Sequence, residues 1–275
     1  MDRVLVFVAH PDDETIGCSG LLQRASTSLV VFAVDGAPPH YGFERRFGSL
    51  RKYSETRFLE ASRALSLIPR CSFQRLRRPD GSYFVDQHLF QDLRRAYSSL
   101  LKIAGEFSPT VIVSHTYEGG HIDHDACSFL AMKTSRALAI QHWEFPLYRK
   151  SELGQDIFQE FRDCREAECV LALSEDEMAV KQRMRAEYRT QREMLRVFVL
   201  DTERFRRIIF EDYTRHQWSD YAFENRPNRL NKESFFRSVA EFEGTPSLPG
   251  RTSSKKMWVP EILARQFHKF WSDER

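Results

Sequence analysis

The sequence predicts an α/β fold, in which a mostly parallel sheet carries helices on both faces. Short apolar runs rich in β-branched and aromatic residues recur along the chain, and such runs are typical of strands buried on both faces. Longer segments with apolar residues at helical spacing lie between these runs. Because strands and helices alternate, we expect parallel strands joined by crossover helices.

The first two expected strands are Val4–Ala9 and Leu29–Val34, both continuous apolar runs. Apolar and small residues in Ile16–Leu22 indicate the start of the helix between them. An Asp-Gly pair ends the second strand, and a proline-rich loop follows. We expect a helix over Ser49–Leu67, because its apolar residues recur at helical spacing and a proline follows shortly afterwards.

The pattern continues through the middle of the chain. Cys71–Leu76 is the third expected strand, and the turn residues after it include Asp80-Gly81. A long amphipathic helix is expected over Asp86–Phe107. Thr110–Ser114 is the fourth expected strand, and a loop with two glycines then leads into a helix expected from about Asp123 to Leu138.

Two further strands are expected at Trp143–Tyr148 and Cys169–Leu173. Ser174 and Glu177 have the spacing of a capping box, in which each side chain bonds to the backbone of the other residue. The helix that begins there is expected to continue to about Arg196.

Beyond residue 200 the alternation weakens, and aromatic residues mix with arginines and prolines. We therefore expect residues 1–200 to form a Rossmann-like α/β domain. Residues 201–275 are expected to form a helical or irregular C-terminal extension packed on the same domain.

Composition and charge narrow the class of protein. The chain has 275 residues, of which 41% are apolar and 29% charged, and its formal net charge is +2. These values exclude a disordered or collagen-like chain and give no sign of nucleic-acid binding. No apolar run approaches the roughly 20 residues of a membrane-spanning helix, so no integral membrane segment is expected.

The cysteines and the N-terminal residues indicate a compartment. The chain has five cysteines, an odd number, and none forms a CxxC pair, so a disulfide framework is not expected. The first apolar run is too short for a signal peptide. We therefore expect a cytoplasmic protein with reduced cysteines.

Two expected strands end in segments rich in histidine and acidic residues. His10-Pro11-Asp12-Asp13-Glu14 follows the first strand, and the segment from His115 to His124 follows the fourth. Functional sites of open α/β sheets form at the carboxyl ends of the strands. A helix N-terminus would explain some of the acidic residues, because negative charge is favourable there. It would not explain a histidine directly after a buried strand, nor two such clusters in one sheet.

Together the two clusters offer imidazoles and carboxylates to a metal ion. His10, Asp13 and His124 are one such set, with the two nitrogens and one oxygen of catalytic zinc sites that keep an open position. Such a metal activates water and polarises a carbonyl group. Asp12 is then available as a general base, and His121 as a general acid or oxyanion stabiliser. Spacing alone does not decide which histidine and which aspartate bind the metal.

The sequence resembles the zinc-dependent de-N-acetylases of the PIG-L/LmbE-like family. The run AHPDDE at Ala9–Glu14, which continues as TIGCSG, is similar to the signature of that family. The run HIDH at His121–His124 resembles its second motif, usually HPDH, with Ile122 where proline is common. Both motifs occur in the family's order, each after a strand. The resemblance covers roughly residues 1–200 and identifies them as an LmbE-like catalytic domain.

The resemblance implies roles for individual residues. It implies three ligands for Zn²⁺: His10, Asp13 and His124. Fe²⁺ can use the same donor set. It also implies that Asp12 is the general base and that His121, oriented by Asp123, acts as acid or oxyanion stabiliser.

Two substrate contacts are implied as well. Arg57, in an Arg-x-x-Glu motif that ends at Glu60, would contact the substrate, and Asp80 would bind sugar hydroxyls. A surface ion pair explains Arg57 and Glu60 equally well. A turn explains the Asp-Gly pair at residue 80 equally well.

The expected activity is therefore zinc-dependent removal of an N-acetyl group from an amino-sugar-type substrate, such as an N-acetylglucosamine derivative. The expected partner is a small amino sugar or glycoconjugate. One alternative is a metal-dependent amidase that acts on a non-sugar amide or a thiol conjugate. Another is a non-catalytic sugar- or nucleotide-binding module, which would not need both Asp12 and Asp13. A dinucleotide site is not expected, because no G-x-G-x-x-G follows the first strand.

Overall fold

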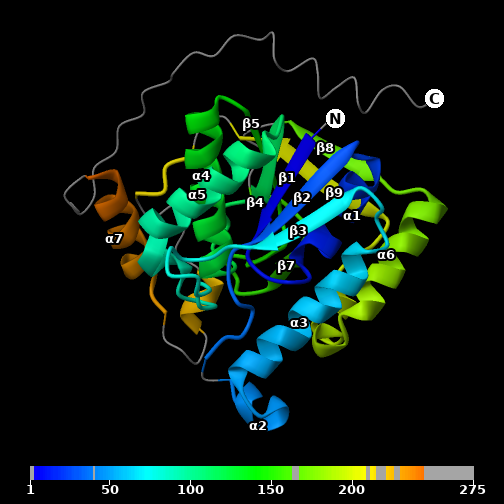
Figure 1. Cartoon of the computed structure of the whole chain (residues 1–275), viewed down its shortest axis with the longest axis horizontal. Coiled ribbons are helices and arrows are strands. Elements are labelled where there is room, and N and C mark those ends of the chain that lie inside the picture. Colours follow the sequence, from blue (N-terminus) through cyan, green and yellow to red (C-terminus); the bar gives the residue numbers. More distant parts are fainter. Residues whose placement is uncertain are drawn as a thin grey trace.

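The computed structural model describes residues 3–39, 41–162, 167–208, 211–214, 221–225 and 230–244. Within these residues, seven strands form one sheet in the order β3-β2-β1-β4-β5-β9-β8 (Figure 1). Five of them are parallel: β1 (Arg3–Val8), β2 (Thr27–Phe32), β3 (Cys71–Arg75), β4 (Val111–His115) and β5 (Gln141–Phe145). The other two strands pair antiparallel: β8 (Glu168–Ala172) and β9 (Thr202–Arg207). The prediction of an α/β fold with a mostly parallel sheet is confirmed.

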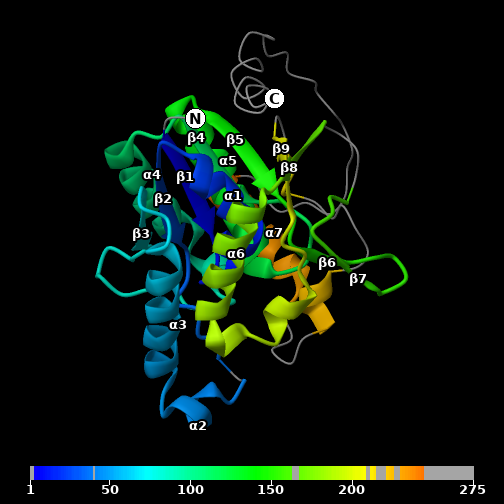
Figure 2. The same cartoon turned by 90° about the vertical axis from the view of Figure 1, so that its right-hand side faces the viewer.

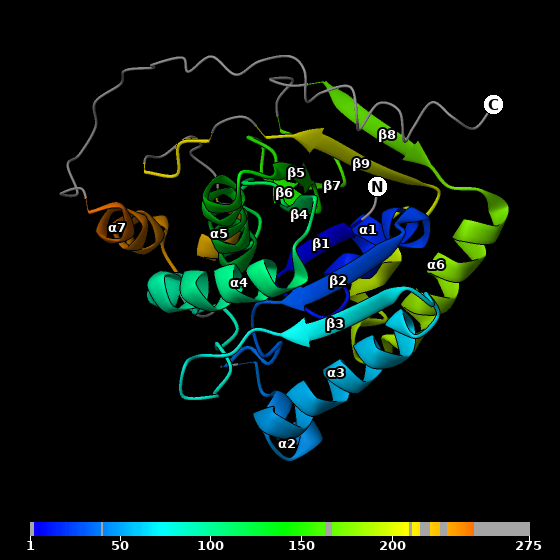
Figure 3. The same cartoon turned by 45° about the horizontal axis from the view of Figure 1, so that its top comes forward.

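Helices cover both faces of the sheet (Figure 3). One face carries α1 (Asp13–Arg24), α3 (Leu50–Leu65) and α6 (Glu175–Glu187). The opposite face carries α4 (Leu93–Phe107), α5 (Ile122–Leu138) and α7 (Lys232–Glu243). Alternate residues of β1 point to the two faces, with Val4 and Val6 in one apolar core and Leu5 and Phe7 in the other. Burial on both faces is what the continuous apolar run of this strand predicts.

Shorter elements complete the described chain. They are α2 (Phe43–Phe47), the hairpin of β6 (Tyr148–Lys150) and β7 (Asp156–Phe158), and the 3-10 helices Leu89–Asp92, Arg189–Gln191, Met194–Val197 and Ala222–Asn225. Among the helices of the described ranges, none combines the length and apolar character needed to cross a membrane. Cys18, Cys71, Cys127 and Cys169 are free, and Cys164 lies outside the described residues.

β9 is the main element that the sequence analysis did not predict. Its sequence is TERFRR, with four charged residues out of six, so it lacks the apolar run of a central strand. It nevertheless lies between β5 and β8. Its Glu203 is buried and accepts hydrogen bonds from the backbone N–H groups of Gly20 and Leu21 and from Lys181 Nζ. The sheet therefore continues past residue 200, and the segment from 201 onwards is not wholly helical or irregular.

The helix expected from Ser174 to about Arg196 is shorter than predicted. Its capping box with Glu177 is confirmed, but α6 ends at Glu187 and two 3-10 helices follow. Beyond the end of α6, the backbone N–H and hydroxyl of Thr190 bond to the carboxylate of Glu60 on α3. These bonds take the place of helical hydrogen bonds.

The strand expected at 143–148 is divided. β5 ends at Phe145, and β6 begins at Tyr148 in a separate hairpin. Pro146 lies between them and has no N–H for a sheet ladder, which accounts for the break.

The strand order places a switch point between β1 and β4. From β1 the chain continues outwards to β2 and β3, whereas from β4 it continues to β5 on the other side. The loops that follow two such strands diverge and leave a crevice at their carboxyl ends. The segments that begin at His10 and His115 both leave the sheet at this crevice, as the sequence analysis expected.

Candidate functional site

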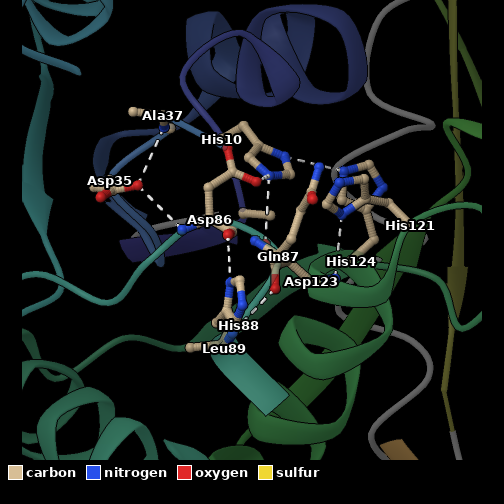
Figure 4. Close-up of polar contacts among 12 residues, drawn as sticks. His10, Asp35, Ala37, Asp86, Gln87, His88, Leu89, His121, Asp123 and His124 are labelled. Atoms are coloured by element: carbon tan, nitrogen blue, oxygen red, sulfur yellow. Dashed lines mark hydrogen bonds and ion pairs between the residues drawn. The ribbon is translucent and has the colours of Figure 1, made fainter. Parts of the chain in front are cut away.

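Three side-chain atoms from three segments form a compact triangle at the switch point. His10 Nδ1 lies 3.3 Å from Asp13 Oδ2 and 3.4 Å from His124 Nε2, and the last two atoms are 3.6 Å apart. All three residues are buried. His10 follows β1, Asp13 opens α1 and His124 lies in the first turn of α5, so the triangle spans the crevice (Figure 4 shows His10 and His124).

The other ring nitrogen of His10 faces two carboxylates. Nε2 lies 3.2 Å from Asp86 Oδ1 and 3.6 Å from Asp123 Oδ2 (Figure 4). Burial alone lowers the pKa of His10, but the charge of Asp86 and hydrogen bonds to Asp123, Asp13 and Asp86 raise it well above its usual range. When Nε2–H is donated to these carboxylates, a neutral ring directs the lone pair of Nδ1 towards Asp13 and His124.

Asp86 is a site residue that the sequence analysis missed, because it placed this residue at the start of a helix. The backbone N–H of Asp86 bonds to Asp35 Oδ1, and the N–H groups of Gln87 and Leu89 bond to the carboxylate of Asp123 (Figure 4). Gln87 also has a φ of +68°. These contacts hold residues 86–88 out of a helix, so that a 3-10 helix begins only at Leu89 and α4 only at Leu93. No local pattern reveals them, because both acceptors lie far away in the sequence.

Asp12 lies beside the triangle in a strained backbone conformation, with a φ of +122°. Its side chain makes no capping hydrogen bond to α1, so a helix N-cap does not explain this aspartate. Asp12 Oδ2 accepts a hydrogen bond of 3.1 Å from Arg57 Nη2. Burial raises the pKa of Asp12 to about 8, although the positive charge of Arg57 opposes the shift. A carboxyl group that titrates near neutrality suits proton transfer.

Arg57 and Glu60 do not form the surface ion pair that was the alternative explanation of their motif. Both are buried. Arg57 donates to the carbonyl oxygens of Gly36 and Pro11 at 2.7 and 2.8 Å, in addition to Asp12. Glu60 accepts hydrogen bonds from the Thr190 region instead. Arg57 thus supports the turn that carries Asp12, and a contact with substrate stays a prediction.

His121 is the N-cap residue of α5, where its Nδ1 accepts a hydrogen bond of 3.2 Å from the backbone N–H of Asp123. In the neutral ring the proton then lies on Nε2, which acts as a donor. The ring centroid is 4.6 Å from that of His10. Asp123 therefore holds His121 through its backbone N–H, while its carboxylate is bonded to Gln87 and Leu89.

The structure does not bring Asp80 to this site. Asp80 is exposed, and its Oδ1 accepts hydrogen bonds from the backbone N–H and hydroxyl of Ser82. Gly81 has a φ of +85°, which completes a turn. This placement corrects the expectation that Asp80 binds sugar hydroxyls, because the local turn holds its carboxylate on the surface.

His115 supports the triangle from the end of β4. Its ring stacks on that of His124 with centroids 3.8 Å apart, and its Nε2 lies 3.2 Å from Asp13 Oδ2. Nε2 of His115 also accepts a hydrogen bond from the backbone N–H of Ala9. A histidine at the end of a buried strand is the sequence signal for this position.

Two buried acids fix the loop that leads to His121. Glu118 Oε1 accepts the backbone N–H groups of Leu147 and Tyr148, and Asp125 Oδ1 accepts those of Glu118 and Gly119. Burial raises the pKa of each acid to about 8. The loop is thereby tied both to α5 and to the segment between β5 and β6.

A pocket of about 240 Å³ opens beside the triangle. Polar site residues line part of it: His10, Asp12, Asp13, Arg57, Asp86 and His121. Aromatic side chains form much of its wall: Tyr41, Phe43, Tyr53, Tyr148 and Phe198. A concave site with mostly apolar walls and a few convergent polar groups is typical of small-molecule binding.

A comparison with known protein families matches residues 5–135 to PIG-L, described as GlcNAc-PI de-N-acetylase. Residues 5–135 form a PIG-L domain. This domain contains both sequence motifs and all three atoms of the triangle. Among curated proteins, no sequence matches the chain.

Solved structures share the fold of this chain at low sequence identity. A triple mutant of a deacetylase from the teicoplanin biosynthetic pathway is 18% identical, with a TM-score of 0.59 over 76% of this chain and 99% of that chain. The N,N'-diacetylchitobiose deacetylase of Pyrococcus horikoshii is 17% identical, with a TM-score of 0.53 over 75% of this chain and 83% of that chain. GalB, the 4-carboxy-2-hydroxymuconate hydratase of Pseudomonas putida, is 15% identical, with a TM-score of 0.51 over 77% and 98%. Because a hydratase shares the fold with two deacetylases, the fold alone does not decide the reaction.

Proposed function

We propose that this protein is a metal-dependent hydrolase that removes an N-acetyl group from an amino-sugar-type substrate, such as an N-acetylglucosamine derivative. The observation that carries the proposal is the triangle of His10, Asp13 and His124 beside a pocket that His10 and Asp13 line, with Asp12 and His121 next to it. The PIG-L match and the deacetylases among the similar structures support it.

The three atoms of the triangle fit a metal ion. For metal–ligand distances of 2.0–2.1 Å, the corners of a tetrahedron lie about 3.3–3.4 Å apart. The observed separations of 3.3, 3.4 and 3.6 Å are close to this value. Two imidazole nitrogens and one carboxylate oxygen would leave a fourth position open, as in catalytic sites. We propose Zn²⁺ as the ion, and Fe²⁺ accepts the same donors.

When bound, the ion would supply Lewis acidity at the amide carbonyl and lower the pKa of water. The carboxylate of Asp12 would take a proton from the attacking water. His121 Nε2–H would donate to the carbonyl oxygen as negative charge develops there. The leaving amine would receive its proton from Asp12 or His121. Arg57 would hold Asp12 in place through its bonds to that carboxylate and to the Pro11 carbonyl.

The experiment is an acetate-release assay on the purified full chain loaded with Zn²⁺ or Fe²⁺. The substrates are N-acetylglucosamine, its glycosides with apolar aglycones, and its phospholipid conjugates. We expect metal-dependent release of acetate from at least one of them. Absence of release from every amino sugar, with one equivalent of metal bound, would contradict the proposal.

The aromatic wall of the pocket favours a second candidate, an amidase that acts on a non-sugar amide or a thiol conjugate. Flat apolar side chains can pack against an aromatic or aliphatic group as well as against a sugar face. Including N-acyl aromatic amines and thiol conjugates in the same panel distinguishes the two activities by the acid released. A sugar-binding module would instead bind N-acetylglucosamine without releasing acetate.

We also propose that the protein is cytoplasmic. The four described cysteines are free, which agrees with a reducing compartment. Immunolabelling of the tagged full chain, in intact and in permeabilised cells that express it, tests this location.

A further inference from the structure

Two short segments flank the mouth of the pocket. Tyr41 and Phe43 reach it at the start of α2, and Met194 and Leu195 reach it from the 3-10 helix after α6. Figures 1 and 2 show α2 and the segment that follows α6 at the same end of the molecule, the lower end in both views. The side chains exposed on these two segments therefore determine which kind of partner surface the mouth of the pocket can approach.

The segment after α6 contributes to a cavity lined by arginines. They are Arg185, Arg189, Arg192 and Arg196, and the remaining lining residues are Gln182 and Ala186. No acidic side chain lines this cavity. Within the part of the chain that the structure describes, Arg196 is the one of the four with an ion-pair partner, Glu193 at 2.9 Å. Like charges gathered in this way repel one another and attract an anionic surface or ligand.

Apolar side chains protrude from the same segment. Met194, Val197 and Val199 are 62%, 52% and 53% exposed. They are interspersed with the arginines and lie next to the pocket mouth, to which Met194 belongs. Removing such groups from water is favourable, and a soluble anion would leave them exposed. This combination of groups fits a partner that is both anionic and apolar.

α2 adds to this surface from the other side of the mouth. None of its residues is buried, and Arg45 and Arg46 are exposed. The segments 43–47 and 185–199 together contain six arginines and three glutamates, a net charge of +3, whereas the whole chain has a net charge of +2. Both segments that flank the pocket mouth therefore carry a net positive charge.

We propose that this end of the molecule docks on an anionic lipid membrane. The docking surface consists of α2 and residues 185–199. Its arginines would pair with lipid phosphates, and Val197 and Val199 would enter the headgroup region, as in proteins that bind membranes peripherally. The pocket mouth would then face the membrane. This inference rests on the surface alone and does not depend on the proposed deacetylase activity.

Vesicle co-sedimentation of the full chain tests the proposal. One set of vesicles contains phosphatidylcholine alone, and a second set also contains phosphatidylglycerol. We expect binding to the second set only, and we expect it to weaken as salt is added, because salt screens the charges. Binding to neither set would overturn the proposal, as would equal binding to both.

Two double variants test the surface residue by residue. Arg189→Glu with Arg192→Glu should lower the affinity for anionic vesicles at least tenfold, because each basic residue near such a membrane contributes about fivefold. Val197→Ser with Val199→Ser leaves the net charge unchanged and should also weaken binding. None of these residues lines the active-site pocket.

The matched control is Arg63→Glu with Arg70→Glu. Both arginines are exposed, and both lie at or beyond the end of α3 that is remote from α2, so the change in net charge is the same. We expect this variant to bind like the wild type, and equal loss in the control would overturn the proposal. Pyrophosphate serves as a soluble probe. If pyrophosphate binds and requires Arg189 and Arg192 while vesicles do not bind, the site takes a soluble anion and the membrane proposal is wrong.

Discussion

Asp86 Oδ1 lies 3.2 Å from His10 Nε2, on the side of the imidazole ring opposite to the triangle. A carboxylate in this position fixes the proton on Nε2, orients the ring and makes Nδ1 a stronger donor to a metal. Asp35, at the end of β2, holds the backbone of Asp86 in turn. The site therefore depends on a residue outside both sequence motifs.

Replacing Asp86 should weaken metal binding without removing a ligand. We expect Asp86→Asn to lower the affinity for Zn²⁺ by about 10–100-fold, because the amide lacks the negative charge that polarises the ring. Calorimetric titration of the metal-free protein measures this. Asp80→Asn is the control, since its exposed turn lies outside the pocket, and it should leave both the metal affinity and KM unchanged. Wild-type affinity in Asp86→Asn would show that the contact is incidental.

The triangle itself predicts the outcome of ligand substitutions. His10→Ala, Asp13→Ala and His124→Ala should each lose most of the bound metal and the activity, because two remaining ligands hold an ion much more weakly. Metal content after gel filtration is the measurement. His88→Ala is the control, a half-buried histidine next to Asp86 that lies outside the triangle. Full metal content in the His124 variant would remove this residue from the ligand set.

Substitution of His121 should separate catalysis from metal binding. Loss of one donor to a developing oxyanion costs on the order of 10²–10³ in kcat. His121→Ala should therefore keep its metal and lose rate to about this extent, with a smaller effect on KM. Steady-state kinetics on protein of known metal content decides the point. Normal turnover would assign His121 to helix capping alone.

Asp12→Asn should keep the metal and be nearly inactive, because an amide cannot accept the proton and general-base catalysis contributes roughly 10²–10⁴ in rate. Burial raises the pKa of Asp12 to about 8 in the absence of a cation, and a bound cation lowers it. A base must be deprotonated to act, so wild-type activity should rise with pH along a limb that lies below pH 8. That limb should be absent from the residual activity of the variant. If Asp12→Asn loses its metal while Asp13→Asn keeps it, the roles of the two carboxylates are exchanged.

Glu118 predicts a dependence of stability on pH. Burial raises its pKa from 4.5 to about 8 in the folded chain, so the folded state binds more protons than the unfolded state between these values. The contribution of this group to stability therefore falls as pH rises from 4.5 to 8 and is constant above that. The glutamine of Glu118→Gln cannot ionise. The free energy of unfolding of this variant, relative to that of the wild type, should therefore increase as the pH rises from 4.5 to 8.

Urea unfolding at both ends of this pH range measures the effect, with Glu106→Gln as the control at an exposed position. If the pH dependence of the Glu118 variant equals that of the control, Glu118 does not titrate in this range.

The site residues that could be predicted from the sequence are those whose position follows from the strand ends. His10 and His124 leave adjacent parallel strands, so the sheet order alone brings them together. Asp86 and the true neighbours of Arg57 could not be predicted in this way. Their positions depend on hydrogen bonds to Asp35 and to the carbonyl of Gly36, which a single-residue pattern does not encode.

The same distinction applies to the fold. The strands β1, β2 and β4 have apolar runs because both of their faces are covered by helices, and these strands were predicted. β9 was missed because its burial relies on specific partners for charged side chains. Arg206 bonds to Glu144 of β5 at 2.6 Å, and Glu203 bonds to Lys181 at 2.9 Å. Such a strand looks like an exposed segment until its partners are known.

The place of β9 in the sheet has a consequence for the order in which the chain matures during synthesis. Every atom of the triangle lies in the first 124 residues. In contrast, β9, which pairs with the edge of β5 away from β4 and carries the carboxylate partner of the buried Lys181, is complete only after residue 207 has left the ribosome. Until then β5 presents an unpaired edge, which is a template for association with other strands. The nascent chain should therefore need protection by chaperones during this interval, although the three residues of the triangle have already been synthesised.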